Sequence, residues 1–258
     1  MEPVRSFCKD SLAVRIYADR TAMGAAAARD GAALLRRLLA QQDTVRAVFA
    51  AAPSQNEFLE ALCAAPDIDW KRVTAFHMDE YVGLDAAAPQ GFGNFLRARV
   101  FDRLPFVQVC YLNGNAPDVE AECSRYAGLL AQAPIDIVFM GIGENGHIAF
   151  NDPPVAEFDD PAAVKVVALD EVCRNQQVHD GCFADIGQVP THALTLTVPT
   201  LAGAKHHLCI VPAPTKAKAV RDTLEGPVST ACPASILRTC PGAVLYLERE
   251  SAQLLTEV

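Results

Sequence analysis

The sequence predicts an α/β protein with an open, mostly parallel, Rossmann-like sheet and helices on both faces. Short apolar runs rich in β-branched residues recur along the 258 residues, and segments with helical spacing of apolar positions lie between them. An apolar fraction of 51% is enough to bury one large core, and no linker rich in proline, glycine and serine interrupts the chain. We therefore expect residues 1–258 to form a single domain.

The expected elements follow one another as repeated strand and helix units. Thr215 is placed to cap the start of the last expected helix, and Gly226 lies just past its end. Residues 153–163 are acidic and interrupted by proline, which indicates a surface loop. The expected strands are 44–51, 73–78, 135–140, 164–169, 193–198, 206–211 and 243–247. The expected helices are 22–41, 55–64, 92–104, 119–131 and 215–224.

Charge and composition exclude several classes of partner. The formal charge is −9 and no run of Lys and Arg is present, which argues against nucleic acid or an anionic membrane as the main partner. A small soluble ligand is favoured. The first ten residues lack a basic segment followed by an apolar one, and no apolar window reaches the roughly 18 residues that span a bilayer. We expect a cytoplasmic protein, and a homo-oligomer is among the states that the sequence leaves open.

Nine cysteines form an odd set without a C-x-x-C pair, and several lie inside apolar runs such as 207–210. This usage is typical of small buried side chains in a reducing compartment, so we expect neither a disulfide framework nor a zinc site.

The most informative segment is GIGENGHIAFND, at 141–152, which follows the apolar run 135–140. It indicates a buried strand that leads into a loop carrying Asn145, His147 and Asp152. Ligands of open α/β sheets bind at the carboxyl ends of strands, so a titratable imidazole there is a candidate acid or base. Taken alone, His147 is better explained as a histidine that only hydrogen-bonds a loop carbonyl, but its neighbours favour catalysis.

A second segment, HMDEYVGL, carries two consecutive carboxylates after another apolar strand. Asp79 and Glu80 cannot both face the core. An Asp-Glu pair in this place is commonly a helix cap or a solvated turn. The presence of the His147 loop favours a second interpretation, in which one of the two carboxylates points at a ligand.

These two motifs resemble the glucosamine-6-phosphate deaminase/isomerase family and, more distantly, its 6-phosphogluconolactonase relatives. The resemblance spans roughly residues 45–250 and consists of several pieces in order. They are MDEYVGL, NGNAPD at 113–118, GIGENGHIAFNDP, ALTLT at 193–197, and Lys216 ahead of LEGPV at 224–228.

The resemblance implies a catalytic set of Asp79, Asn145, His147 and Asp152. An aspartate at the position of Asp79 moves a proton between C2 and C1 of the opened amino sugar, which requires one base that reaches both carbons. A histidine at the position of His147 assists ring opening, oriented by Asn145 and by the acidic residue at 152. The family commonly has Glu where this chain has Asp152. The reaction needs neither a metal nor an organic cofactor, and none is signalled.

The other end of the substrate carries a phosphate. The expected strand 44–51 leads into Ser54 and Gln55, where a helix start offers N–H groups and a hydroxyl to an anion. The family normally has a loop rich in Gly, Thr and Ser here, whereas AAAPSQ contains no glycine. Lys216 is the ammonium that the resemblance assigns to the phosphate.

The family's phosphate-binding arginine falls close to Gln177 in this chain, and Arg174, a turn away, is the expected substitute.

Three functions remain open. The leading hypothesis is an aldose–ketose isomerase/deaminase that converts an amino-sugar 6-phosphate, most simply glucosamine 6-phosphate, to fructose 6-phosphate and ammonia. The second is lactone hydrolysis in the manner of the 6-phosphogluconolactonases, for which Asp79 is dispensable. The third is a sugar-phosphate sensor that has kept the fold without efficient turnover, supported by the altered phosphate loop and the missing arginine.

Overall fold

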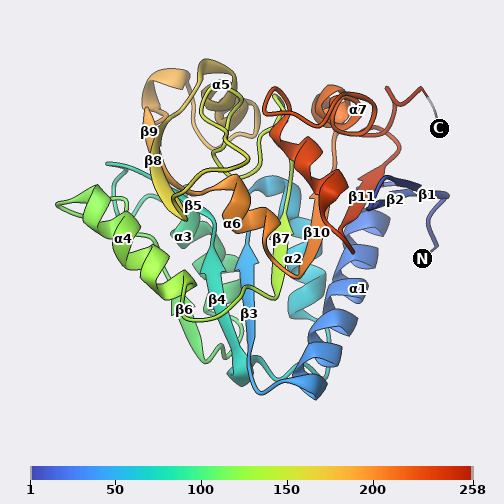
Figure 1. Ribbon diagram of the computed structural model, residues 1–258, viewed down its shortest axis with the longest axis horizontal. Coiled ribbons are helices and arrows are strands. Elements are labelled where there is room, and N and C mark those ends of the chain that lie inside the picture. The colour runs from blue at the N-terminus through green and yellow to red at the C-terminus, as the bar shows by residue number, and fades with distance from the viewer. Residues whose placement is uncertain (1, 257–258) are drawn as a thin grey trace.

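The computed structural model describes residues 2–256 and divides their strands between two sheets (Figure 1). The larger sheet has eight strands in the order β1-β2-β11-β10-β7-β3-β4-β6. Every neighbouring pair in it is parallel except the β1–β2 hairpin at one edge. Its strands are β1 (Arg5–Lys9), β2 (Leu12–Tyr17), β3 (Val45–Phe49), β4 (Val73–His77), β6 (Gln108–Cys110), β7 (Ile137–Met140), β10 (His206–Val211) and β11 (Val244–Glu248).

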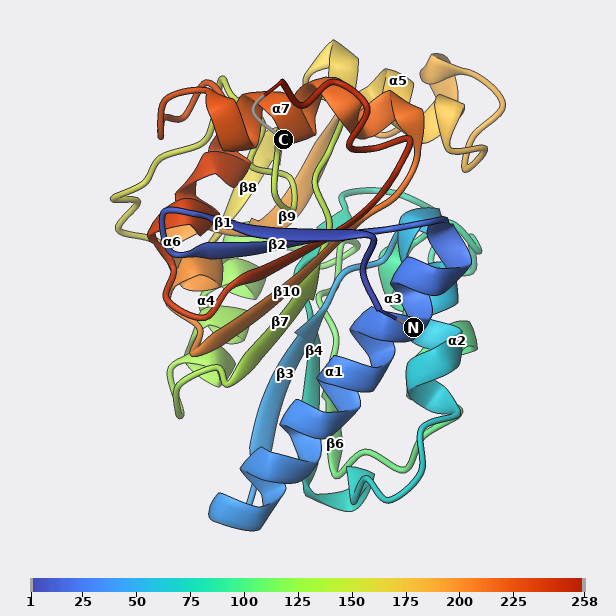
Figure 2. The same cartoon turned by 90° about the vertical axis from the view of Figure 1, so that its right-hand side faces the viewer.

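Helices cover both faces of this sheet, as Figure 2 shows from the side. Side chains alternate along the central strands: Ala47 and Phe49 belong to one core, while Val48 belongs to the other. The first core is closed by α1 (Arg20–Gln41), α2 (Asn56–Cys63) and α3 (Phe92–Leu96). The second is closed by α4 (Val119–Leu130), α6 (Val198–Ala202) and α7 (Ala217–Glu225). The α/β class and the mostly parallel sheet that the sequence predicts are thus confirmed.

The chain changes direction in the sheet between β3 and β7. From β3 it continues outward to β4 and β6, then returns to place β7 on the other side of β3, and from β7 continues to β10. The loops that leave the carboxyl ends of β3 and β7 therefore diverge. Such a switch point is where open α/β sheets bind ligands.

A second sheet of three antiparallel strands lies beyond the carboxyl ends of the parallel strands. It consists of β5 (Asp79–Tyr81), β9 (His192–Leu196) and β8 (Val164–Ala168), in the order β5-β9-β8. Residues 164–169 and 193–198 are therefore correctly predicted as strands, but they do not belong to the parallel sheet. Helix α5 (Glu171–His179) connects β8 to β9 and lies at the upper end of the view in Figure 1.

Other expectations about elements need correction. Six elements of the structure are absent from the prediction: β1, β2, β5, β6, α5 and α6. The expected helix 92–104 is α3 followed by a π-helical turn, Arg97–Phe101. Thr215 does not cap α7, because it lies in a 3₁₀ turn, Pro214–Lys216, that precedes the helix. Gly226 does follow the end of α7, as predicted, and its N–H donates to the carbonyl of Asp222.

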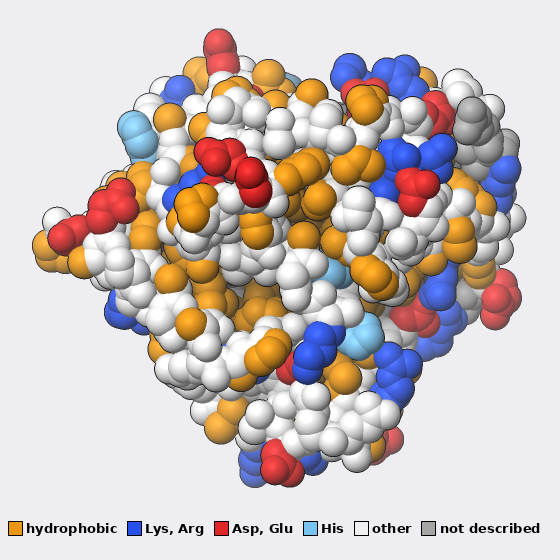
Figure 3. All heavy atoms as spheres, viewed as in Figure 1, with side chains coloured by type: hydrophobic (Ala, Val, Ile, Leu, Met, Phe, Trp, Pro, Cys, Tyr) orange, Lys and Arg blue, Asp and Glu red, His pale blue; other side chains and the backbone are white. Residues whose placement is uncertain are grey.

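The surface carries both signs of charge. On the face seen in Figure 3, Lys and Arg side chains alternate with Asp and Glu in small groups instead of forming one basic area. Among residues 2–256, no helix is long and apolar enough to cross a membrane. All nine cysteines are free thiols, and six of them are buried.

Candidate active site

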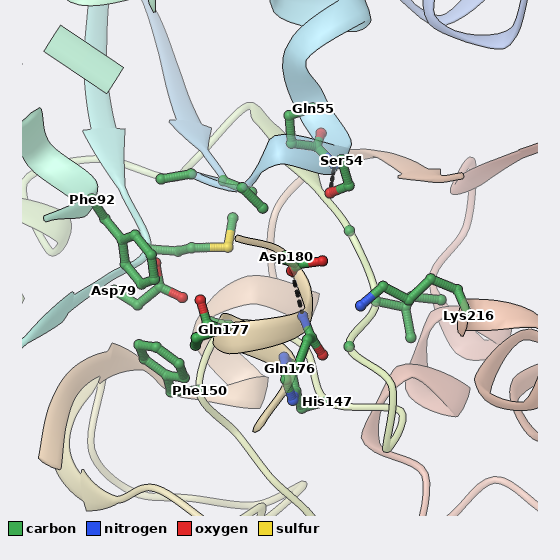
Figure 4. Close-up of a pocket in the computed structure, with 18 residues that line it drawn as sticks. Ser54, Gln55, Asp79, Phe92, His147, Phe150, Gln176, Gln177, Asp180 and Lys216 are labelled. Atoms are coloured by element: carbon green, nitrogen blue, oxygen red, sulfur yellow. Dashed lines mark hydrogen bonds between the residues drawn. The ribbon is translucent and has the colours of Figure 1, made fainter. Parts of the chain in front are cut away.

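A cavity with an empty volume of about 550 Å³, including the part open to solvent, lies at the β3–β7 switch point (Figure 4). The loops after β3, β4, β7 and β10 and the end of α5 all contribute to its lining. Five of the side chains that the sequence singled out line it together: Ser54, Gln55, Asp79, His147 and Lys216. Segments far apart in the chain, such as those of Ser54 and Lys216, thus meet at one place, as a ligand site of this fold requires.

Asp79 reaches the cavity because the chain leaves the large sheet at Met78 and enters the small one. The N–H of Leu196 donates to the carbonyl of Met78 at 2.8 Å, and Asp79 pairs with Thr195 in register. Burial, and after it the charge of Glu80, raises the pKa of Asp79 well above its ordinary value. A carboxylate in such a place is a stronger base than an exposed aspartate once it is ionised.

A buried histidine fixes the backbone at Asp79. Nε2 of His77 accepts the N–H of Leu112 at 2.9 Å, which leaves Nδ1 as the protonated nitrogen, 2.8 Å from the carbonyl oxygen of Asp79. Burial lowers the pKa of His77 to about 4, so the ring is neutral at pH 7. His77 is therefore a structural group.

Glu80 has the capping role that the Asp-Glu pair also suggested. Its carboxylate accepts the N–H groups of Tyr81, Phe92 and Gly93 at 2.8–3.0 Å and so caps the start of α3. Burial raises its pKa, although the three N–H groups act in the opposite direction. The two consecutive carboxylates thus divide their roles, with Glu80 holding the structure and Asp79 facing the cavity.

His147 is held by a loop that closes on itself. The N–H of Gly143 donates to the carbonyl of His147, and the N–H of His147 donates to Oδ1 of Asn145 at 3.0 Å. Nδ2 of Asn145 donates to Oδ1 of Asp152 at 2.9 Å. The same oxygen lies 2.8 Å from Nδ1 of His147, an ion-pair distance whose angle departs from that of a hydrogen bond. Asn145 and Asp152 therefore lie behind the imidazole, and Nε2 is left for a ligand.

The charge of Asp152 is retained in this setting. Burial alone would raise the pKa of Asp152, but the contact with His147 and the amide of Asn145 outweigh it, and the pKa lies below its ordinary value. An ionised carboxylate at Nδ1 orients the ring and stabilises its protonated form. This arrangement suits an imidazole that accepts and returns a proton.

Two glycines make the loop fit. A Cβ on Gly143 would lie 2.2 Å from the His147 ring, so no larger residue allows the imidazole to occupy its place. Gly146 has φ +86°, a conformation that residues with a Cβ rarely adopt. Two of the three glycines of the motif are thus explained, Gly143 by close approach and Gly146 by backbone conformation.

One group among the described residues has the spacing of a metal site. Donor atoms of His147, Asp152 and Cys173 lie within 4.8 Å of one another. Burial first, then the charges of Asp152 and Asp170, raises the pKa of the Cys173 thiol well above its ordinary value. A protonated thiol is a poor metal ligand, and the imidazole and carboxylate already contact each other, so the donor set fits an acid–base pair better than a metal ion.

The opposite end of the cavity has a different character. Nε2 of Gln55 donates to the carbonyl of Ile210 at 3.0 Å and to Oγ of Ser54 at 3.1 Å, which ties the loop after β3 to the end of β10. Lys216 is 4% exposed, and its Nζ has no partner, nor has Oε1 of Gln55. Burial lowers the pKa of Lys216, against the charges of Asp180 and Glu144. A buried ammonium without a partner marks a place for an anion.

Arg174 does not line the cavity. Its guanidinium donates to the carbonyls of Ile186 and Val189 at 2.7 and 2.8 Å, so it closes the loop after α5 instead of facing a ligand. The arginine substitution expected from the sequence therefore lacks structural support. Gln177, at the position expected for the family's arginine, does line the cavity.

Four side chains that line the cavity were not predicted as site residues: Phe92, Phe150, Gln176 and Asp180. The two aromatic rings are stacked, with centroids 5.4 Å apart, beside Asp79 (Figure 4). Gln176 and Asp180 come from α5 and its end, an element that the apolar pattern did not reveal. A run of amide side chains in RNQQ was the available signal.

Comparison with known proteins gives a consistent result. A family model described as glucosamine-6-phosphate isomerases/6-phosphogluconolactonase matches residues 18–246. The chain is 38% identical over 202 residues to a glucosamine-6-phosphate deaminase of Listeria innocua, covering 78% of this chain and 84% of that protein. It is also 38% identical over 190 residues to that of Bacillus thuringiensis, covering 74% and 71%. These matches confirm the predicted resemblance.

Solved structures agree. A monomeric glucosamine-6-phosphate deaminase is 30% identical, with a TM-score of 0.85 over 93% of this chain and 99% of that one. A 6-phosphogluconolactonase from Thermotoga maritima shares the fold, with 18% identity and a TM-score of 0.74 over 92% of this chain and 99% of that one.

Proposed function

We propose that this chain, which belongs to the glucosamine-6-phosphate isomerase/6-phosphogluconolactonase family, is an enzyme that converts glucosamine 6-phosphate and water to fructose 6-phosphate and ammonia. The observation that carries the proposal is that Asp79 and His147 line one cavity, although Asp79 follows β4 and His147 lies in the loop after β7. Relatives that bear the deaminase name at 38% identity support the substrate.

Ring opening is the first step. Nε2 of His147 takes the proton of the C1 hydroxyl and delivers a proton to the ring oxygen, so the C1–O5 bond breaks and an aldehyde forms at C1. The carboxylate of Asp152, 2.8 Å from Nδ1, stabilises the imidazolium that forms in between. Ring opening leaves the imidazole as it began.

Isomerisation is the second step. The carboxylate of Asp79 removes the proton from C2, the electron pair forms a C1–C2 double bond, and the C1 oxygen gains a proton that His147 takes up from the solvent. Asp79 then returns its proton to C1 while the nitrogen electron pair forms a C2–N double bond. The raised pKa of Asp79 brings its basicity closer to that of the weakly acidic carbon than an exposed aspartate allows.

Hydrolysis completes the reaction. Water adds to C2 of the iminium ion, the C2–N bond breaks, and ammonia leaves with one of the two protons of water. The other proton returns to the solvent and balances the proton that the C1 oxygen gained. The ketose that remains is fructose 6-phosphate. No step of this sequence changes the oxidation state of the substrate as a whole, since the oxidation at C2 balances the reduction at C1.

The polar groups at the other end of the cavity hold the phosphate in this proposal. The ammonium of Lys216 supplies the charge, and the Ser54 hydroxyl donates a hydrogen bond. Placing the phosphate there leaves C1 and C2 near the pair of Asp79 and His147. Binding energy at the phosphate then positions the reacting carbons.

Direct assay tests the proposal. Purified protein is incubated with glucosamine 6-phosphate, and ammonia and fructose 6-phosphate are each measured, with the Asp79→Asn variant as a matched control. Equal amounts of both products, formed by the wild type only, are expected. Tight binding of the sugar phosphate without product would favour a sensor, and hydrolysis of 6-phosphogluconolactone by both proteins would favour a lactonase.

A further inference from the structure

The phosphate end of the cavity contains one cation among the described residues. Within residues 2–256, Lys216 is the only Lys or Arg that lines the cavity. The guanidinium of Arg174 lies outside the cavity and donates to two backbone carbonyls. Gln177 and Gln55 offer amide groups where a phosphate site commonly has a guanidinium or backbone N–H groups. A dianion placed here meets a single positive charge.

A carboxylate faces the same end. Asp180 ends α5 and lines the cavity, and its Oδ2 accepts a weak hydrogen bond from Nε2 of Gln176 at 3.3 Å. In Figure 4 the Asp180 carboxylate lies between Ser54 and the side chains of Gln176 and Lys216. Of the charged groups that act on Lys216, Asp180 contributes the most and Glu144 follows. The ammonium therefore shares its surroundings with two carboxylates.

We propose that Asp180 is a specificity-determining residue, whose carboxylate lowers the affinity of the distal end of the cavity for a phosphate dianion. This inference rests on the proposed function, because it concerns the same substrate end. The carboxylate weakens the affinity for phosphate that Lys216 provides. A sugar phosphate is accordingly bound less tightly than the burial of Lys216 alone suggests.

Two effects of removing the Asp180 charge oppose each other. Repulsion of the phosphate disappears, which strengthens binding, but Lys216 also loses a counter-charge that helps keep it protonated. Because a bound phosphate carries more charge than the carboxylate and itself keeps Lys216 protonated, the loss of repulsion dominates in the complex.

The test compares Asp180→Asn with the wild type and with Asp159→Asn, which removes one charge from the exposed residue Asp159 in the 153–163 loop. Binding of inorganic phosphate is measured by calorimetry, and KM is measured for glucosamine 6-phosphate. We expect Asp180→Asn to lower both constants by about five- to tenfold, as the loss of one like charge within one cavity predicts. Binding of unphosphorylated glucosamine is expected to change less than twofold, and Asp159→Asn is expected to match the wild type.

Other outcomes decide differently. Unchanged or weaker phosphate binding in Asp180→Asn overturns the inference, and so does an equal gain for Asp159→Asn. Asp180→Ser replaces the variant if Asp180→Asn does not fold, and Asp180→Glu keeps the charge and is expected to retain wild-type binding. If no protein forms fructose 6-phosphate while Asp180→Asn still binds phosphate more tightly, the proposed function fails and the inference stands.

Discussion

The two ends of the cavity differ in whether their polar groups have partners within the protein. At the catalytic end, the groups behind the imidazole contact one another: the Asn145 amide and the His147 imidazole both contact Oδ1 of Asp152, and Asn145 also accepts the backbone N–H of His147. At the distal end, Nζ of Lys216 and Oε1 of Gln55 are buried without a partner. The imidazole is thus oriented before a ligand arrives, whereas the distal groups gain their partners from the ligand.

This difference predicts that substitutions at the two ends affect different kinetic constants. Groups that are already oriented contribute to the chemical step, so their removal is expected to lower kcat. Groups that have no partner until the ligand binds contribute to binding, so their removal is expected to raise KM. The variants below test whether this division holds.

The largest effect is expected for Asp79→Asn. An amide cannot take the C2 proton, so kcat is expected to fall by about 10³-fold or more, the range typical of a general base. Turnover is measured as ammonia release. The thermal midpoint should not fall, because the variant removes a carboxylate whose charge is costly to bury. A variant with more than a tenth of the wild-type kcat would exclude Asp79 as the base.

A smaller effect is expected for Asp152→Asn, which keeps the shape and removes the charge behind His147. With the imidazolium less stabilised, kcat is expected to fall by about 10²-fold while KM changes little. Steady-state kinetics over a range of substrate concentrations distinguishes the two constants. A change confined to KM would show that Asp152 acts on binding instead of on the imidazole.

At the distal end, Lys216→Met is expected to act mainly on KM. Loss of one charge-assisted contact with the phosphate corresponds to about 1.5–3 kcal/mol, or roughly 10- to 100-fold in KM. Methionine retains the length and the apolar stem of lysine, so packing in the buried site is preserved. The division of the cavity would be wrong if kcat fell as much as KM rose.

The smallest effect concerns the backbone that leads to Lys216. Ala213 has φ 84° and ψ 145°, a region that is nearly restricted to glycine, and its N–H donates to the buried carboxylate of Glu248 at 3.0 Å. Ala213→Gly is expected to relieve about 1 kcal/mol of strain and raise the thermal midpoint by roughly 2–4 °C. Calorimetry measures it, and a lower midpoint would mean that the side chain contributes more than its strain costs.

The sequence predicts the parts of the molecule whose patterns are local. β10 begins and ends where expected, because HHLCIV carries a short apolar run, with Lys205 before it and Pro212 after it. The loop with Asn145, His147 and Asp152 follows a fully buried strand. Its glycines and polar residues lie within twelve consecutive positions, so the motif can be recognised without knowledge of distant contacts. Local signals of this kind suffice to locate the catalytic end.

Elements that depend on distant contacts were not predictable in the same way. β5 has only three residues, two of them acidic, and exists because it pairs with β9, more than 100 residues later. Helix α5 shows no clear apolar stripe, so it was not recognised, and with it Gln176 and Asp180 were missed. The same helix holds Arg174, whose carbonyl partners come from the loop that follows.

The central claim is that one carboxylate, Asp79, moves a proton between adjacent carbons of a substrate held beside His147. Glucosamine 6-phosphate labelled with deuterium at C2 tests it most directly, with the fate of the label followed by NMR. In the wild type the label is expected to leave C2 and to appear at C1 of fructose 6-phosphate or in the solvent, whereas with Asp79→Asn it remains at C2 of recovered substrate. Loss of the label from C2 at an equal rate in both proteins would contradict the account.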